Sequence, residues 1–252
     1  VYQPFSVGFL LVDNQQTFAG IGQTPNQRSL GGYLDALEPT ATGPLGDLLF
    51  DLQLSTEAEV LSALTQLQGQ IYATLPVANV QQTSQNLALL RNQLALSLEC
   101  DEAEGQQGWV RGYGMGGSLS GNFNASGYSA GIGGTEFAYQ RCMGDGCSVG
   151  GFGNFGWSRI DLRDVRERAT VDSYQAGVSI QHVGELCYVL GVVGFGVQDN
   201  DITRDIQVPG LMGRAENSLS SWQQFDYLEL GTRIVLGRAE FCPYVAGQYI
   251  FI

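Results

Sequence analysis

The chain has 252 residues, of which 44% are apolar, and this composition excludes a disordered tail and allows one large domain or two ordinary ones. Its net charge is -13 and its basic residues are all arginine, which excludes a nucleic-acid binder because phosphate contacts need a basic patch. The sequence lacks any run of about 18 apolar residues, so a transmembrane helix is excluded, but a transmembrane strand needs only about 9 to 11 residues.

The first part of the chain is expected to contain a strand and two short helices. Residues 1–22 are expected to form a short strand followed by a loop that contains glycines. Thr24 in the N-cap position, with Gln27 three residues later, predicts a helix that continues to about Leu37. A second short helix is expected over residues 45–52.

Two longer helices are expected next. Thr56 and Glu59 form a capping box, which predicts a helix to about Ala73, and Pro76 is expected to break it. Another helix should run from Asn79 to Leu98, with an apolar stripe made by Leu87, Leu90, Leu94 and Leu98. It would be roughly 30 Å long, close to the thickness of a bilayer's hydrocarbon core. A helix on the side of a soluble domain fits the same periodicity.

From residue 107 onward, short segments alternate apolar and polar residues, and a period of two residues predicts strands. In one of them Tyr174, Val178 and Ile180 fall on one face, while Ser173 and Gln175 fall on the other. Seven strands are expected: Gln107–Leu119, Gly127–Arg141, Cys147–Ile160, Ala169–Val183, Leu186–Gln198, Trp222–Leu236 and Phe241–Ile252. The apolar face points inward in a soluble barrel and outward in an outer-membrane barrel, and alternation alone does not distinguish them.

The links between these strands alternate in length. Three are tight, at residues 142–146, 184–185 and 237–240, and the others are longer and polar, among them 161–168 and 199–221. A membrane barrel has short periplasmic turns and longer outer loops, because successive connections lie at opposite ends. The alternation therefore favours a membrane barrel over a soluble sandwich.

The five cysteines suit an oxidising compartment, and their odd number leaves at least one unpaired or paired with another chain. Cys142 and Cys147 flank a turn sequence, which predicts a local disulfide, with two reduced thiols as the alternative. Cys187 and Cys242 also lie beside tight turns, and Cys100 precedes the first strand at the same end. We hypothesise that all five lie at the periplasmic rim.

Four segments, in this order, resemble the autotransporter proteins of type V secretion: TPNQR at 24–28, LDAL at 34–37, ALTQLQGQIYA at 63–73 and GWVRGYG at 108–114. The resemblance covers essentially the whole chain. It implies an all-β transmembrane barrel, antiparallel and up-and-down, with an N-terminal helical linker that plugs it. The family's barrel is expected to have twelve strands, of which about seven are present here. About five more strands, or neighbouring chains, are expected to complete the wall, because open edges in lipid leave backbone groups unpaired.

The resemblance also implies a division of the chain. Residues 1–23 would be the end of a β-helical passenger, 24–106 a helical linker whose last helix threads the pore, and 107–252 the incomplete translocator barrel. The candidates for facing the lumen are Gly112, Gly114, Gly116, Gly131, Gly133, Glu229 and Arg233. The glycines share one face of each of the first two strands, where they would let a helix approach closely. The two charges would need a polar partner or water.

The sequence predicts no catalytic constellation, no cofactor and no metal site, because the single His182 lies at a strand end and no glycine-rich stretch precedes a helix. We expect a non-enzymatic translocator in the bacterial outer membrane that anchors and helps export its N-terminal passenger to the cell surface. Its expected partners are outer-membrane lipid, the passenger, the outer-membrane assembly machinery and neighbouring copies. Two alternatives stay open: a structural or adhesive surface protein anchored by the same barrel in a multi-chain assembly, and a soluble all-β binding module.

Overall fold

The computed structural model describes residues 16–96, 105–236 and 239–252. The strand expected near the start of the chain and the last residues of the predicted pore-threading helix lie outside these ranges. The described residues divide into two compact units, one helical and one built on a large sheet.

Among the described residues, the helical unit contains 16–68 together with segments 122–125 and 206–213 from the second half of the chain. Its elements are α1 (Phe18–Ile21), α2 (Pro25–Leu37), the 3-10 helix η1 (Glu38–Thr40), α3 (Pro44–Gln53) and α4 (Glu57–Leu67). Its apolar core is formed by Phe18, Leu34, Leu49, Leu52, Val60, Ala63, Leu64 and Val208.

Capping residues start the helices as predicted. Thr24 and Gln27 form a complete capping box at α2, and Thr56 and Glu59 form another at α4. Each box satisfies backbone N–H groups that have no partner within the helix. The stretch expected to be a loop before Thr24 holds the short helix α1, whose first turn is capped by the hydroxyl of Thr17.

The predicted break at Pro76 is wrong. Helix α4 ends at Leu67, and α5 (Gln70–Leu96) continues without interruption through Pro76. The break occurs at Gly69, whose φ of +63° is in the left-handed region that favours glycine. Proline removes one helical hydrogen bond, and the buried residues on both sides of it, including Leu75, hold α5 against the sheet despite that loss.

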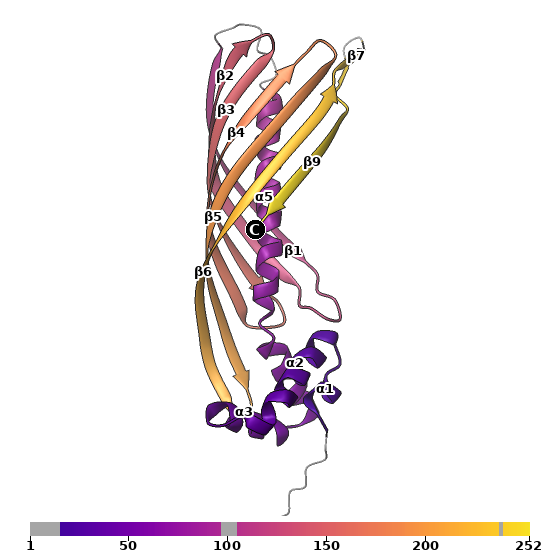
Figure 1. The fold of residues 1–252 in the computed structure, drawn as a ribbon, viewed down its shortest axis with the longest axis vertical. Helices are drawn as coiled ribbons and strands as arrows, with labels where there is room; N and C mark the ends of the chain where they lie inside the picture. The colour runs from indigo at the N-terminus through magenta and orange to yellow at the C-terminus, as the bar shows by residue number, and fades with distance from the viewer. Residues whose placement is uncertain (1–15, 97–104, 237–238) are drawn as a thin grey trace, which may run out of the picture. The chain divides into compact units, whose positions relative to one another are not determined.

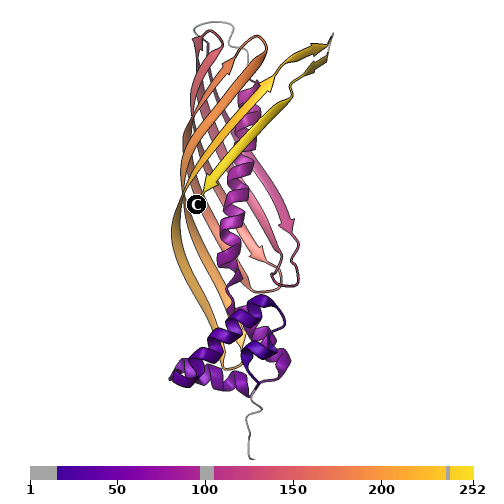
Figure 2. The same cartoon turned by 45° about the vertical axis from the view of Figure 1, so that its right-hand side comes forward.

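The sheet unit contains an open, antiparallel sheet of seven strands in the order β1-β2-β3-β4-β5-β6-β9. The predicted seven-stranded, up-and-down arrangement is therefore confirmed. The strands are β1 (Gln106–Leu119), β2 (Tyr128–Gly144), β3 (Cys147–Leu162), β4 (Glu167–Val183), β5 (Cys187–Val208), β6 (Leu211–Thr232) and β9 (Tyr244–Phe251), with β7 (Ile234–Leu236) and β8 (Ala239–Phe241) in a separate two-stranded ribbon. Figures 1 and 2 show α5 running along the concave face of the curved sheet. In the described part of the chain, no helix combines the length and apolar character needed to cross a membrane.

The long polar loop predicted over residues 199–221 is wrong. Strand β5 continues to Val208 and β6 begins at Leu211, so the connection is a tight turn in which Gly210 has a φ of +74°. The segment contains charged residues because one side of the two strands is exposed here. On that side, the hydroxyl of Ser220 donates a hydrogen bond to Asp199 at 2.6 Å. Polarity on one face of a long strand resembles a loop when only the sequence is considered.

The predicted disulfide between Cys142 and Cys147 is wrong. Cys142 is disulfide-bonded, but Cys147 is a free thiol 3.2 Å from Nδ1 of His182, and Cys187 is also free. The turn between β2 and β3 contains only Asp145 and Gly146. Up-and-down topology places these three cysteines and Cys242 at the same end of the sheet, as predicted, and Cys100 lies outside the described residues.

Candidate functional site on the sheet face that carries helix α5

The buried side of α5 has three layers, which are apolar, polar and apolar in turn. From its N-terminal end these are Ile71, Leu75 and Ala78, then Asn79, Gln82, Thr83 and Asn86, then Leu87, Leu90 and Leu94. The first layer packs on a cluster from β2 to β5, and the third packs on residues of β2, β3, β5 and β6. Between these two clusters the helix meets the sheet through amides and hydroxyls.

A buried carboxylate receives the N-terminus of α5. Glu167 of β4 accepts a hydrogen bond from the backbone N–H of Ile71 at 2.8 Å and another from Arg204 of β5 at 2.9 Å. Negative charge is favourable at a helix N-terminus, where N–H groups lack intrahelical partners. This contact fixes where α5 begins along the sheet.

The middle layer is a network of neutral polar side chains. Gln82 donates to Ser173 at 2.9 Å, and Thr83 donates to Gln223 at 2.8 Å. The remaining direct contacts are Asn86 to Gln175, Gln175 to Thr83, Asn79 to Asn200, and Gln198 to Gln223. The sheet presents this polar strip from β4, β5 and β6.

The polar layer leaves some of its groups without hydrogen bonds. The side-chain oxygens of Asn79, Gln82 and Asn86 accept none within the described part of the chain. An unsatisfied buried amide costs about 1–3 kcal/mol. The layer therefore keeps the contact between α5 and the sheet polar. It adds less stability than an apolar core of similar area would.

An ion pair joins the last part of α5 to the sheet. Arg91 contacts both carboxylate oxygens of Glu229 in β6, at 2.8 and 2.7 Å. Tyr188 donates to the same carboxylate at 2.5 Å, and Tyr227 donates to it as well. The guanidinium of Arg91 also lies over the ring of Tyr244 in β9, 4.3 Å from its centre.

A second ion pair lies on the same face of the sheet, near its β1 edge. Arg111 of β1 donates to Glu136 of β2 at 2.8 Å, and the Glu136 side chain is only 2% exposed. Beside it, Tyr113 donates to Asn154 of β3 at 3.0 Å. The α5-facing side of the wall thus carries polar and charged residues from β1 to β6, in addition to its two apolar clusters.

The two charges expected to face the lumen have different positions. Glu229 lies on the face that carries α5, and its side chain is 0% exposed. Arg233 lies just beyond the end of β6 and is exposed. The partners of Glu229 could not be read from the sequence, because Arg91 is 138 residues away from it along the chain.

The prediction for the five glycines is wrong. Gly112, Gly114 and Gly116 alternate with Arg111 and Tyr113, so they lie on the face opposite α5. The same holds in β2 for the other two predicted positions: a Cβ on Gly133 would meet the exposed ring of Trp157 on the outward side, and Gly131 shares its face. Glycine spacing indicates the wrong face because large polar residues, not glycines, mark the inner face of β1.

Other glycines allow the close approach. A Cβ on Gly156 of β3 would lie 2.9 Å from Nε2 of Gln82 in α5, and a Cβ on Gly134 of β2 would collide with Tyr113. Both glycines share a face with buried polar residues in their own strands. That neighbourhood was the signal in the sequence that could have identified them.

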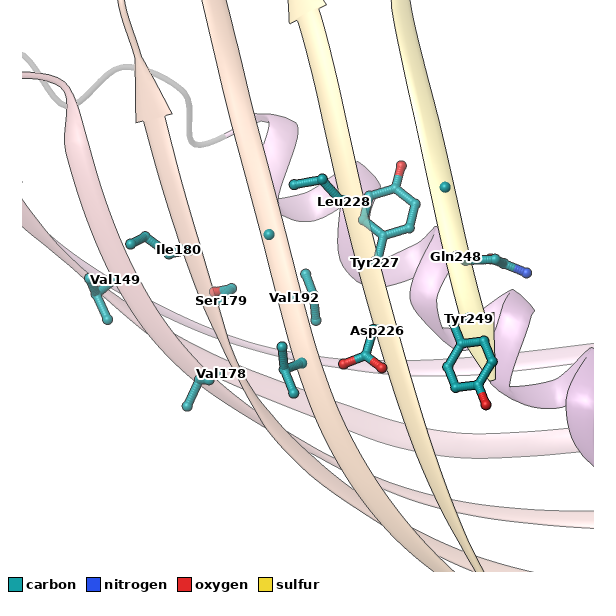
Figure 3. Close-up of a pocket in the computed structure, with 13 residues that line it drawn as sticks. Val149, Val178, Ser179, Ile180, Val192, Asp226, Tyr227, Leu228, Gln248 and Tyr249 are labelled. Atoms are coloured by element: carbon teal, nitrogen blue, oxygen red, sulfur yellow. The ribbon is translucent and has the colours of Figure 1, made fainter. Parts of the chain in front are cut away.

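The opposite face of the sheet is covered with large apolar side chains. Phe155 stacks on Phe137 with ring centres 6.1 Å apart and meets Tyr174 edge-on at 5.8 Å. The exposed residues on this side, which we call the outer face, include Trp157, Val178, Ile180, Phe195, Leu228, Leu230 and Tyr249. A groove of about 620 Å³ is lined by Val178, Leu228 and Tyr249 among others. Figure 3 labels these residues on the strands that carry them.

Comparisons with known proteins agree with this arrangement. The family model of the autotransporter β-domain matches residues 108–252. The translocator domain of the autotransporter NalP from Neisseria meningitidis matches in structure with a TM-score of 0.55 and 16% identity, over 66% of this chain and 56% of that chain. The chain therefore spans little more than half of that solved structure. No curated protein sequence matches it.

The likeness to this translocator domain concerns the fold, which in this chain is an open antiparallel sheet of seven strands. The family match extends over more than half of the sequence. The chain belongs to the autotransporter β-domain family, as the resemblance in its sequence predicted.

Proposed function

We propose that this chain is the outer-membrane translocator of an autotransporter, which anchors an N-terminal passenger and helps export it to the bacterial cell surface. In this proposal residues 107–252 form part of the barrel wall, and α5 is the segment of the linker, residues 24–106, that occupies the pore. Residues 1–23 are the end of the passenger. Glu229 then faces the lumen and holds α5 through Arg91.

The distribution of polarity over the two faces of the sheet supports this proposal. The face along α5 carries glutamines, asparagines, serines and three buried carboxylates beside its two apolar clusters, while the outer face carries exposed aromatic and branched side chains. A soluble barrel places its apolar residues inside, whereas a membrane barrel places them against lipid and keeps its lumen polar. The outer face is therefore a lipid-facing surface.

The polar layer suits a channel through which a polypeptide has passed. A chain in transit exposes backbone N–H and C=O groups, which need polar surroundings at every step. Side-chain amides and hydroxyls supply both donors and acceptors without a fixed charge. The ion pair at Arg91 and Glu229 then stops α5 at one position along the wall.

The proposal is tested with the natural full-length protein, expressed in a bacterial host with an epitope tag on the passenger. We expect the protein in the outer-membrane fraction, extraction only by detergent, and removal of the tag by protease added to intact cells. A stable monomer in detergent-free buffer would contradict the proposal. So would a tag that becomes accessible only after the cells are lysed.

A second candidate function, an anchor within a multi-chain surface array, is supported by the cysteines. Cys147 and Cys187 are free thiols at the same end of the sheet as the oxidised Cys142. Thiols in an oxidising compartment can be oxidised to disulfides between chains. Ladders on non-reducing gels that collapse in Cys187→Ser would support the array, and a single band in both proteins would exclude cysteine-linked copies.

A further inference from the structure

The core of the helical unit includes a segment from the second half of the chain. Val208, near the end of β5, is only 6% exposed and belongs to the same cluster as Leu49, Leu52 and Leu64 of α3 and α4. Ile206 packs against this cluster as well. The end of the β5–β6 hairpin, residues 206–213, therefore belongs to the helical unit and contributes to its core, and we call this segment the hairpin tip.

Polar contacts fix the position of the hairpin tip on the helices. The backbone N–H of Gln207 donates to Oε1 of Gln66 in α4 at 2.9 Å. At the turn, a Cβ on Gly210 would lie 2.2 Å from Oδ2 of Asp51 in α3, so only glycine fits beside that carboxylate. Within a few residues, the hairpin tip thus has a buried apolar side chain, a backbone hydrogen bond to α4 and a glycine that lies close to α3.

A second loop of the unit makes a similar contact. The backbone N–H of Asn26, in the first turn of α2, donates to Oδ1 of Asn124 at 2.9 Å, and its side chain donates to the Asn124 carbonyl at 3.2 Å. Asn122 shapes this loop by accepting hydrogen bonds from the backbone N–H groups of Asn124 and Ala125. The loop is therefore held in shape by its own residues and offers a ready acceptor to an exposed helix N-terminus.

We propose that the hairpin tip is a docking surface for the helical segment 16–68, which completes its core only on that tip. A segment of about 50 residues buries too small a share of its surface to be more than marginally stable alone. Adding Val208 and Ile206 from a preformed hairpin supplies apolar area without further ordering of the helices. The occupant of the surface is thus this chain's own linker.

The consequence for export rests on the proposed function. The linker cannot be folded while it passes through the pore, so its core forms when it reaches a hairpin that is already part of the assembled sheet. Docking then clamps the passenger's attachment point at the surface. The hairpin tip thereby makes folding of the linker dependent on completion of the wall.

Hydrogen exchange on the full chain in detergent micelles tests the docking. We compare Val208→Asp, which puts a charge into the shared core, with Met212→Asp, which makes the same change on the same tip at a side chain that is 78% exposed. We expect amides in α3 and α4 to lose protection at least tenfold in Val208→Asp and to stay unchanged in Met212→Asp, while β3 and β4 are unaffected in both. Wild-type protection of α3 and α4 in Val208→Asp overturns the proposal.

A milder variant covers the case in which Val208→Asp disrupts the sheet. Val208→Ala removes two methyl groups, and we expect a smaller loss of protection confined to the same helices. No change in α3 and α4 in this variant also overturns the proposal.

An experiment in intact cells distinguishes a failure of this inference from a failure of the proposed function. In intact cells, added protease should cut within the linker of Val208→Asp and leave a membrane-bound fragment that has lost the helical segment 16–68, whereas the fragment left by Met212→Asp should keep this segment. Failure of the wild-type protein to reach the outer membrane would contradict the translocator function and leave the micelle result standing. Membrane-bound fragments of equal length in both variants, with both in the outer membrane, would contradict the clamp.

Discussion

At the scale of single residues, Glu229 concentrates the polar contacts between the wall and the helix. Its carboxylate accepts hydrogen bonds from Arg91, Tyr188 and Tyr227 and is inaccessible to solvent. We expect Glu229→Gln to lower the free energy of unfolding by about 1.5–3 kcal/mol, because it leaves a partly buried guanidinium without its counter-charge. Urea unfolding in micelles measures this.

The control for Glu229 is an exposed ion pair on the same strand. Glu216 contacts Arg214 at 2.8 Å, and its side chain is 68% exposed. Glu216→Gln should change stability by less than about 0.5 kcal/mol, since exposed pairs contribute little. If Glu229→Gln were as neutral as this control, the ion pair would not hold α5.

Glu59 gives the helical unit a pH dependence. The backbone and side-chain hydrogen bonds from Thr56 hold the pKa of the exposed Glu59 carboxyl below its usual value. A lowered folded-state pKa contributes stability that is present above the unfolded pKa and is lost as pH falls through the folded one. We therefore expect wild-type α4 to be better protected than Glu59→Gln at neutral pH, with the difference vanishing in acid. Hydrogen exchange of the first-turn amides across that pH range checks it, and a constant difference would contradict it.

At the scale of elements, Gly69 separates α4 from α5. Its φ is +63°, and a Cβ at this position would lie 3.2 Å from the ring of Tyr72, which leaves little room for a side chain. Gly69→Ala should cost about 1–2 kcal/mol because an L-residue is strained there. Gly32→Ala, inside α2 and with space for a methyl group, should instead add about 0.5–1 kcal/mol. Thermal unfolding of both variants checks the contrast, and equal shifts would contradict it.

The sequence predicted elements where the signal is local. Capping boxes at Thr24 and Thr56 specified the starts of α2 and α4, because the hydrogen-bonding partners are three residues apart. Period-two alternation likewise specified the strands. The break at Pro76 was wrong because packing of α5 on the sheet outweighs one missing backbone hydrogen bond.

The errors that matter for the site depend on long-range pairing. Which face of β1 turns toward α5 depends on its register with β2, and the pairing of Arg111 with Glu136 shows the face that glycine spacing alone did not. Residues 199–208 resemble a loop because they are charged, although Asp199, Asp201 and Asp205 belong to the exposed side of a long strand. The docking of the hairpin tip was not visible in the sequence, since Gln66 and Gln207 are 141 residues apart.

At the scale of the whole molecule, the exposed apolar side chains lie on the outer face of the sheet, whereas a soluble barrel would place them inside. This arrangement determines how much a charged substitution on the outer face changes the free energy of unfolding. Val178 is 59% exposed in the middle of the outer face of β4. On a soluble protein, Val178→Arg at such an exposed position changes stability by about 0.5 kcal/mol or less. On a lipid-facing wall the same change costs about 2–4 kcal/mol near the bilayer midplane.

Urea unfolding of the protein in lipid vesicles should show the larger cost for Val178→Arg. Tyr33→Arg is the matched control, because Tyr33 is 63% exposed in the helical unit, outside the proposed wall. We expect the control to stay within about 0.5 kcal/mol of wild type. If both substitutions were equally harmless, the outer face would not contact lipid, because an arginine in hydrocarbon must either be buried at a cost or bend toward the interface.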